Sequence, residues 1–329
     1  MRAYVIRRVI IVIPTVFIIT VLIFVLMRLV PGDIVDDMIW RMEQAGEIYE
    51  GDEERLRAHY GLDTPAPLAF GRFLGVAPQP NGEYSGLFQG QLGESWIQRR
   101  PVLQMIGEKL PVTVELGLLA FVMAQLISLP IGIFSAIRQN TALDYAGRSF
   151  AIIFISAPSF WVATLVFVFG GLWFGYLPSV TFTPFFQDPV RNLRMMWVPA
   201  LTTALLMGGG MMRWVRTMML EVMRQDYVRT AWSKGLREAL VVGRHALKNT
   251  MIPVVTVMGL QIPILIGGQV VIEQIFNLPG MGFMVVQALN TRDYPLVSGV
   301  MLVISFGIVV INLITDITYG FLDPKVQYK

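Results

Sequence analysis

The chain has 329 residues, of which 54% are hydrophobic and 15% are charged, and its formal net charge at pH 7 is +3. A soluble globule of this length needs more polar side chains to cover its surface, so the composition excludes an ordinary soluble domain. The composition therefore predicts a protein that is embedded in a membrane.

Six windows of the sequence contain no Asp, Glu, Lys or Arg, and each is long enough to cross a bilayer as a helix. A hydrocarbon core of ~30 Å needs about 20 helical residues, and a helix satisfies its own backbone hydrogen bonds inside lipid. The third window is too long for one crossing, and we place that crossing at 150–174 because Gly175 and three prolines then mark a loop. The windows are 9–27, 116–137, 149–187, 195–212, 249–272 and 294–315.

Charges between the windows predict the orientation of the chain. Residues 1–30 are interpreted as an uncleaved anchor span rather than a signal peptide, because the apolar run is long and no small-residue cleavage site follows it. With Arg2, Arg7 and Arg8 in the cytoplasm, six crossings place both termini there, and the basic loops then also fall inside. Segment 31–109, which is acidic near its start, becomes extracytoplasmic.

The remaining residues, 110–329, form the membrane core in this interpretation. It contains five further spans and a cytoplasmic loop at 216–249 between spans four and five. The five spans are predicted at about 112–137, 150–174, 196–215, 250–272 and 295–317.

The basic stretch DYVRTAWSKGLREALVVGRHALKN, residues 226–249, lies in that cytoplasmic loop. On a helix its apolar side chains recur at i, i+4 and form a stripe, while the basic residues occupy other faces. Gly235 interrupts the helix at a cost of about 1 kcal/mol relative to Ala, which indicates a bend or the close approach of another backbone. A helix resting on anionic lipid headgroups and a docking element for a partner both fit these features. The stripe consists of Val228, Trp232, Leu236 and Leu240.

The same stretch resembles the cytoplasmic loop of the inner-membrane permeases of ATP-binding-cassette importers, specifically their dipeptide, oligopeptide and nickel branch. Their general pattern is E-A-A-x-x-x-G-x9-I-x-L-P, of which Ala231, Gly235 and Leu247 match, whereas the Glu, the first Ala, the Ile and the Pro are replaced. The peptide branch typically has DYVRTA..KGL followed by RHALKN..IP, as this chain does. Further stretches extend the resemblance over nearly the full length: RLVPGD, YGLDTP, LGES, RPVLQMI, APSFW, FNLPGMG, RDYPLV and FLDPK.

The resemblance implies an all-α polytopic membrane permease with six transmembrane helices in the inner membrane of a bacterium or archaeon. It also implies a sister permease subunit, two ATPase subunits and an extracytoplasmic substrate-binding protein as partners. In the family, a short coupling helix from the loop seats in a groove on the ATPase and moves the spans. The residues assigned to ATPase coupling are Asp226, Tyr227, Val228, Arg229, Ala231, Trp232, Lys234, Gly235, Leu236, Arg244 and His245.

The sequence contains no G-x-x-x-x-G-K-[ST] phosphate loop, so we expect ATP and Mg²⁺ in the partner ATPases and no cofactor bound by this chain. We predict no catalytic residue and no metal site. The two histidines, His59 and His245, are predicted on opposite faces of the membrane, and the chain has no Cys. The lipid bilayer is an expected partner, and nucleic acid is not.

An ion-coupled secondary transporter is the alternative from another class, and it should place carboxylates or histidines near the membrane midplane. Here Glu115, Glu273 and Asp316 lie at the ends of apolar runs, which favours interpreting them as charges at the membrane interface rather than as a lining of the pathway. We keep Glu273 and Asp293 as candidates for an outer gate or a lining of the transport pathway. Short peptides are the first substrate prediction, and nickel or nickel chelates, haem, glutathione and oligosaccharides are the alternatives.

Two compositional features of the core have alternative explanations. The triplet 208–210 is Gly-Gly-Gly, which fits either a moving pore or close helix packing. The methionines between 195 and 223 predict core packing rather than a path for soft metals, because metal paths usually add His or Cys.

Overall fold

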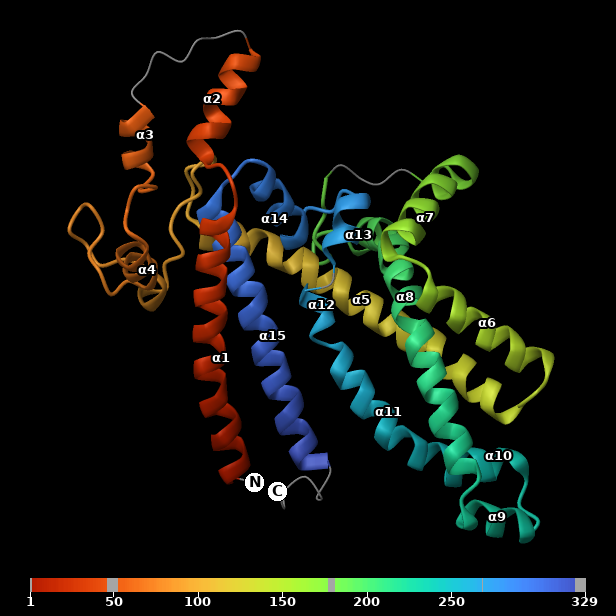
Figure 1. Cartoon of the computed structure of the whole chain (residues 1–329). Coiled ribbons are helices and arrows are strands. Elements are labelled where there is room, and N and C mark those ends of the chain that lie inside the picture. The colour runs from red at the N-terminus through yellow and green to blue at the C-terminus, as the bar shows by residue number, and fades with distance from the viewer. Residues whose placement is uncertain (1, 46–52, 177–180, 268, 323–329) are drawn as a thin grey trace. The chain divides into compact units, whose positions relative to one another are not determined.

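A computed structural model of the chain describes residues 2–45, 53–176, 181–267 and 269–322 (Figure 1). Every regular element in these ranges is a helix, and the β-type pairing among them is an isolated bridge between Glu94 and Pro101. The prediction of an all-helical chain is confirmed.

Five helical stretches in the described ranges are long and apolar enough to cross a membrane, and a sixth results when α6 (Ala142–Ser156) and α7 (Ser159–Phe174) count as one span. These two helices are bent by 106°, so the crossing predicted at 150–174 is not one continuous helix. Pro158 disfavours helical geometry at Ala157, whose φ and ψ are −78° and 131°. The five stretches are Tyr4–Gln44, Val102–Ile137, Pro189–Met223, Glu238–Gly267 and Tyr294–Thr318.

The crossing predicted at 250–272 is also divided. α11 (Leu247–Gln261) ends before Pro263, α12 (Ile264–Gly267) begins after that proline, and α13 (Val270–Ile275) begins after Gln269. A proline inside a helix removes a backbone donor and clashes with the preceding turn, which explains the first break. The described residues of this predicted span thus form three short helices, and the crossing itself stays a prediction.

The chain forms two compact units. The first contains residues 1–5, 112–279 and 310–329, and the second contains 6–111 and 280–309. Three long helices contribute residues to both units: α1 (Arg2–Leu29), α5 (Val102–Ile137) and α15 (Tyr294–Leu322).

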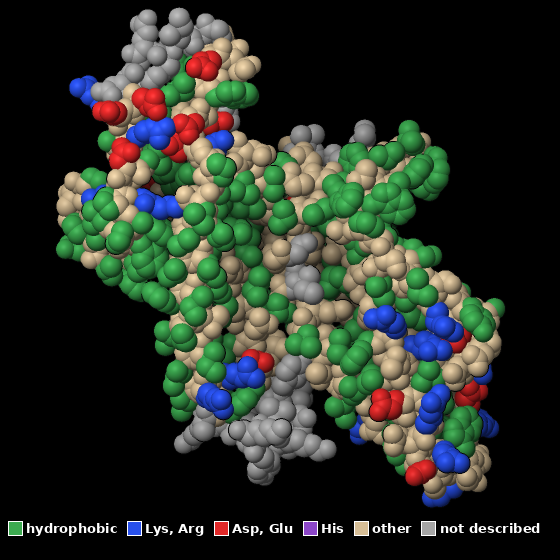
Figure 2. All heavy atoms as spheres, in the orientation of Figure 1, with side chains coloured by type: hydrophobic (Ala, Val, Ile, Leu, Met, Phe, Trp, Pro, Cys, Tyr) green, Lys and Arg blue, Asp and Glu red, His purple; other side chains and the backbone are tan. Residues whose placement is uncertain are grey.

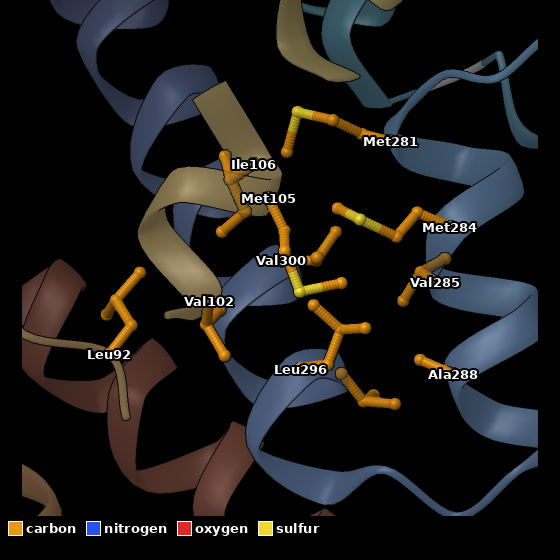
Figure 3. Packing of buried hydrophobic residues seen from close by; sticks show 11 residues of the cluster. Leu92, Val102, Met105, Ile106, Met281, Met284, Val285, Ala288, Leu296 and Val300 are labelled. Atoms are coloured by element: carbon orange, nitrogen blue, oxygen red, sulfur yellow. The ribbon is translucent and has the colours of Figure 1, made fainter. Parts of the chain in front are cut away.

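The second unit has a core where the start of α5 packs against α14 (Met281–Asn290) and α15 (Figure 3). Val102, Met105 and Ile106 of α5 point toward apolar side chains of the other two helices. Gly299 lets α15 approach closely, because a Cβ there would lie 2.5 Å from Cγ1 of Val102. The unit also contains α1 from residue 6 on, α2 (Ile34–Gln44), α3 (Glu53–His59), α4 (Ala66–Leu74) and the 3₁₀ turn η1 (Leu87–Gln89).

The first unit is organised around α8 (Pro189–Met223), which begins at an N-cap where Asp188 accepts a hydrogen bond from the Arg191 N–H at 3.0 Å. α8 packs against α6, α7, α11 and α13. At Gly209 a Cβ would lie 3.0 Å from the Ala151 carbonyl oxygen of α6, whereas a Cβ built on Gly210 meets no described atom within 4 Å outside its own helical backbone. Gly209 therefore supports the packing interpretation of the glycine triplet. The methionines at 195, 196, 211, 212 and 219 are buried, which confirms their predicted role in the core.

Candidate functional site

The predicted coupling loop folds into three short elements after α8. They are α9 (Asp226–Ser233), α10 (Glu238–Leu240) and the π-helical turn η2 (Val241–Ala246), which leads into α11. α8 itself continues to Met223, past the predicted end of the fourth span at 215. In Figure 1, α9 and α10 lie at the C-terminal end of α8.

The inner side of this segment is packed against the chain itself. Val228 and Ala231 of α9 are buried together with Val241, and Met223 and Leu236 pack against them. A small β-branched or methyl side chain at these positions allows short helices to lie close to one another. Val228 and Ala231 therefore attach α9 to the rest of the first unit.

The apolar stripe expected along one helix does not form. α9 ends at Ser233, and Gly235 adopts a left-handed backbone with φ +73°, its N–H donating to the Trp232 carbonyl at 2.9 Å. No described atom lies within 4 Å of a Cβ built on Gly235, so the glycine serves the bend and not a close approach within the chain. As a result Leu236 faces inward while Trp232 and Leu240 are exposed.

The outer side carries aromatic, apolar and basic groups. Tyr227, Trp232 and Leu240 are 43%, 41% and 42% exposed, and a shallow depression of about 550 Å³ follows Gly235, lined by residues 235–237, 239 and 240. The Tyr227 hydroxyl is held by the Asn249 side-chain amide, which donates at 2.8 Å. Figure 2 shows Lys and Arg side chains gathered on this part of the first unit. Such a surface offers apolar contact area within a positively charged rim.

The predicted coupling residues thus divide by burial. Asp226, Tyr227, Arg229, Trp232, Lys234, Gly235 and Arg244 are exposed, Leu236 and His245 are half-buried, and Val228 and Ala231 are buried.

A buried ionic network near this segment was not predicted. Asp144 of α6 is fully buried and forms an ion pair with the Arg216 guanidinium of α8. The Nε–Oδ1 distance is 2.7 Å and the Nη2–Oδ2 distance is 2.8 Å. The Ser135 hydroxyl of α5 donates to the same carboxylate at 2.6 Å, and the Asn140 N–H donates at 2.9 Å. The signal in the sequence is that Asp144 is the single acidic residue of the basic loop 138–148.

Further contacts connect the coupling segment to α5 and α8. Nη1 of Arg138, just after α5, lies 3.1 Å from Oε1 of Glu238 in α10. Val242 and Ala246 of η2 are buried with Ala136 and Met219. The ends of α5 and α8, the turn η2 and α9 are therefore packed together.

The two candidate pathway residues are both buried. Glu273 of α13 is 0% exposed and accepts a hydrogen bond from the Thr113 hydroxyl of α5 at 2.6 Å. Asp293, in the second unit, is 1% exposed and accepts hydrogen bonds from the Ser95 hydroxyl and from the Trp96 N–H at 3.1 Å. Asp293 thus fastens the turn at 95–97 to the start of α15. A role in the pathway stays a prediction for both.

Residues 128–328 match the family described as binding-protein-dependent transport system inner membrane component. The chain belongs to this family. Residues 1–117 match the N-terminal region described for the same kind of membrane component. The resemblance seen in the sequence is therefore confirmed, and this chain is a permease of the multi-pass membrane type.

Several relatives are similar to this permease over its whole length. A Brucella abortus protein named as a candidate peptide transport system permease is 40% identical over 334 residues, covering 100% of both chains. The oligopeptide transport system permease protein AppB of Bacillus subtilis is 35% identical over 334 residues, with 100% coverage of both. The glutathione transport system permease protein GsiC of Pectobacterium atrosepticum is 35% identical over 329 residues, again with 100% coverage of both.

Proposed function

We propose that this permease is the transmembrane subunit of an ATP-driven importer of short peptides. The family description supports dependence on a binding protein, and the relatives are named for peptides, oligopeptides and glutathione, itself a tripeptide. Peptides are thus the substrate class that these names have in common. Nickel or its chelates, haem and oligosaccharides are the alternative cargoes.

The proposed assembly contains this permease, a sister permease, two ATPase subunits and an extracytoplasmic binding protein in the inner membrane of a bacterium. Six crossings would place both termini in the cytoplasm, with segment 31–109 on the other side. Residues 46–52 and 323–329, which belong to that segment and to the C-terminus, lie outside the described residues. ATP and Mg²⁺ would bind only to the ATPases, and this chain would catalyse no covalent step.

The coupling proposal rests on the contrast between the buried side and the exposed side of α9. Val228 and Ala231 attach the helix to its own chain, while Tyr227, Arg229 and Trp232 face outward. A force applied to the outer side would pass through the packed ends of α5 and α8 to the membrane spans. ATP binding would favour one arrangement of the spans and hydrolysis would restore the other, which is alternating access.

The docking role of α9 can be tested with Trp232→Asp in the complete complex. The variant should insert in the membrane but lose the ATPases on purification, because a charge would replace a central apolar contact. Trp40→Asp is the matched control, because Trp40 is 58% exposed on α2 and lies outside the coupling segment. Normal ATPase association and normal transport in Trp232→Asp would remove this assignment.

The substrate class can be tested by uptake measurements in the native host. Deleting the gene should abolish ATP-dependent uptake of labelled di-, tri- or oligopeptides and leave uptake of ⁶³Ni²⁺ unchanged. Loss of nickel uptake with intact peptide uptake would replace the peptide assignment with the nickel alternative. Transport that persists in vesicles without ATP and follows an ion gradient would favour a secondary transporter instead.

A further inference from the structure

The short helix α4 packs along the side of the first membrane helix, α1. The ring centroid of Phe70 lies 6.4 Å from that of Phe17 and 5.1 Å from that of Phe24, and the centroid of Phe73 lies 6.1 Å from that of Phe24. Figure 1 shows α4 beside the C-terminal half of α1, and not beyond its end.

The depth of these rings follows from the charges of α1. The charge-free window 9–27 lies between Arg8 and Arg28, and at ~1.5 Å per residue it measures about 28 Å, close to the ~30 Å of a hydrocarbon core. Arg28 then marks one edge of the core. On the same helical rise, Phe24 lies about 6 Å and Phe17 about 16 Å inside that edge. Phe70 contacts both, so it lies at acyl-chain depth.

The outward surface of α4 has the composition that lipid requires. Its sequence APLAFGRFL contains one charge, Arg72, and residues 65–68 are exposed and apolar. Val76 and Phe88 nearby are 59% and 69% exposed. The first membrane stretch is also open, because only 11% of the most apolar window of Tyr4–Gln44 is buried. In Figure 2 the surface over α4 and α1 is mainly hydrophobic. The two helices thus present one continuous apolar surface.

The backbone of α4 is also suited to a medium without water. Pro65 and Pro67 remove two of the N–H groups that the start of a helix leaves unpaired. At the other end, Gly75 adopts a left-handed conformation and donates to the carbonyls of Gly71 and Arg72, and Val76 N–H donates to Gly71 at 2.9 Å. Inside lipid each unsatisfied backbone group costs several kcal/mol, so closed helix ends are required there.

Two arginines bind backbone carbonyls just before and just after α4. Arg28 donates to the Thr64 carbonyl at 2.6 Å, just before α4, and its guanidinium lies 5.5 Å from the ring centroid of Phe24. Nε of Arg72 donates to the Pro78 carbonyl at 2.9 Å, in the polar loop after α4. Long cationic side chains commonly keep their stems in the apolar layer and their heads at the interface.

We propose that α4 is embedded in the bilayer leaflet at which α1 ends, with phospholipid acyl chains covering its exposed face. Segment 31–109 then does not lie wholly in water, because residues 65–76 within it form an anchor that enters one leaflet without crossing the membrane. Under the topology proposed above this is the outer leaflet. The proposed depth of α4 depends only on α1 crossing the membrane. The experiment can therefore support or overturn it independently of the proposed substrate and of ATPase coupling.

The absence of cysteine allows a direct test by single-site labelling. Leu68→Cys, 40% exposed on α4, is labelled with an environment-sensitive fluorophore in the complete complex reconstituted in phosphatidylethanolamine–phosphatidylglycerol vesicles. Ile18→Cys on the exposed face of α1 is the lipid control, and Glu54→Cys on exposed α3 is the water control. Val76→Cys is a second reporter should the first variant not assemble.

The expected result is strong quenching at Leu68 by acyl-chain nitroxide lipids, as at Ile18, with iodide quenching several-fold weaker than at Glu54. Iodide quenching equal to that at Glu54 would overturn the proposal, because α4 would then lie in water. Protection from both quenchers would also overturn it, because another protein subunit would then cover α4.

Discussion

Arg216 and Asp144 form a buried two-point ion pair that joins α8 to α6, with the Arg216 side chain 17% exposed and Asp144 not exposed at all. The Ser135 hydroxyl adds α5 to the same network, since it donates to Oδ1 of Asp144. Three helices therefore meet at one carboxylate beside the proposed docking segment. This network explains how charge can be retained next to apolar spans: each charge is paired and hydrogen-bonded.

Removing one partner of this pair should destabilise the permease strongly. Asp144→Asn leaves the Arg216 charge without its partner, and Arg216→Met leaves the buried Asp144 charge without its partner; an uncompensated buried charge typically costs ~3–5 kcal/mol. Thermal unfolding of the purified complex should show a large loss for each single variant and less than their sum for the double variant. The exposed pair Arg138–Glu238 is the control, and Arg138→Met should cost only about 0–1 kcal/mol. Strict additivity in the first pair would contradict the observed contact.

Gly209 and Gly210 should respond in opposite ways to the same substitution. A methyl group at Gly209 would meet the Ala151 carbonyl oxygen at 3.0 Å and Cβ of Phe154 at 3.2 Å, so Gly209→Ala should push α6 away from α8 and lower thermal stability. A Cβ built on Gly210 meets no atom of the described residues within 4 Å outside its own helical backbone, so Gly210→Ala should be neutral or stabilising by up to about 1 kcal/mol through helix propensity. Equal behaviour of the two variants would show that this packing is absent.

The bend at Gly235 should be sensitive to any side chain that disfavours a left-handed backbone. Gly235→Val faces a conformational penalty of at least ~1–2 kcal/mol at φ +73°, and β-branching adds to it, whereas Gly235→Asn should be tolerated. We expect Gly235→Val to insert normally but to show a lower ratio of transport to ATP hydrolysis, because α9 and Leu236 would be displaced. If Gly235→Val and Gly235→Asn had the same ratio of transport to ATP hydrolysis, the bend at Gly235 would not be needed for coupling.

Asp293 should matter for the structure of the second unit. Asp293→Ala would leave the Ser95 hydroxyl and the Trp96 N–H without their buried acceptor, and each such loss costs about 1–3 kcal/mol. Hydrogen exchange should then accelerate at 95–97. Asp188→Ala is the comparison, because it removes a single exposed N-cap contact with Arg191 and should cost about 1 kcal/mol. Unchanged exchange at 95–97 in Asp293→Ala would show that the carboxylate does not hold this turn.

Several features were readable from the residues alone. The charge-free windows identified the apolar helices, because transfer of a segment into lipid depends mainly on the segment's own side chains. The family and the position of the proposed coupling segment followed from local motifs that need no tertiary contact. Gly235 was correctly singled out as a break in the helix, since its conformational freedom is a property of that one residue.

Only the tertiary structure showed which side of each element packs against the rest of the chain. Whether 150–174 and 250–272 are straight, whether Val228 faces inward or outward, and whether α4 lies beside α1 all depend on neighbours distant in the chain. Asp144 and Arg216 are 72 positions apart, and Thr113 and Glu273 are 160 apart. Hydropathy describes the preference of each segment for lipid or water, but the choice of partner is set by packing and electrostatic contacts that exist only after the helices have come together.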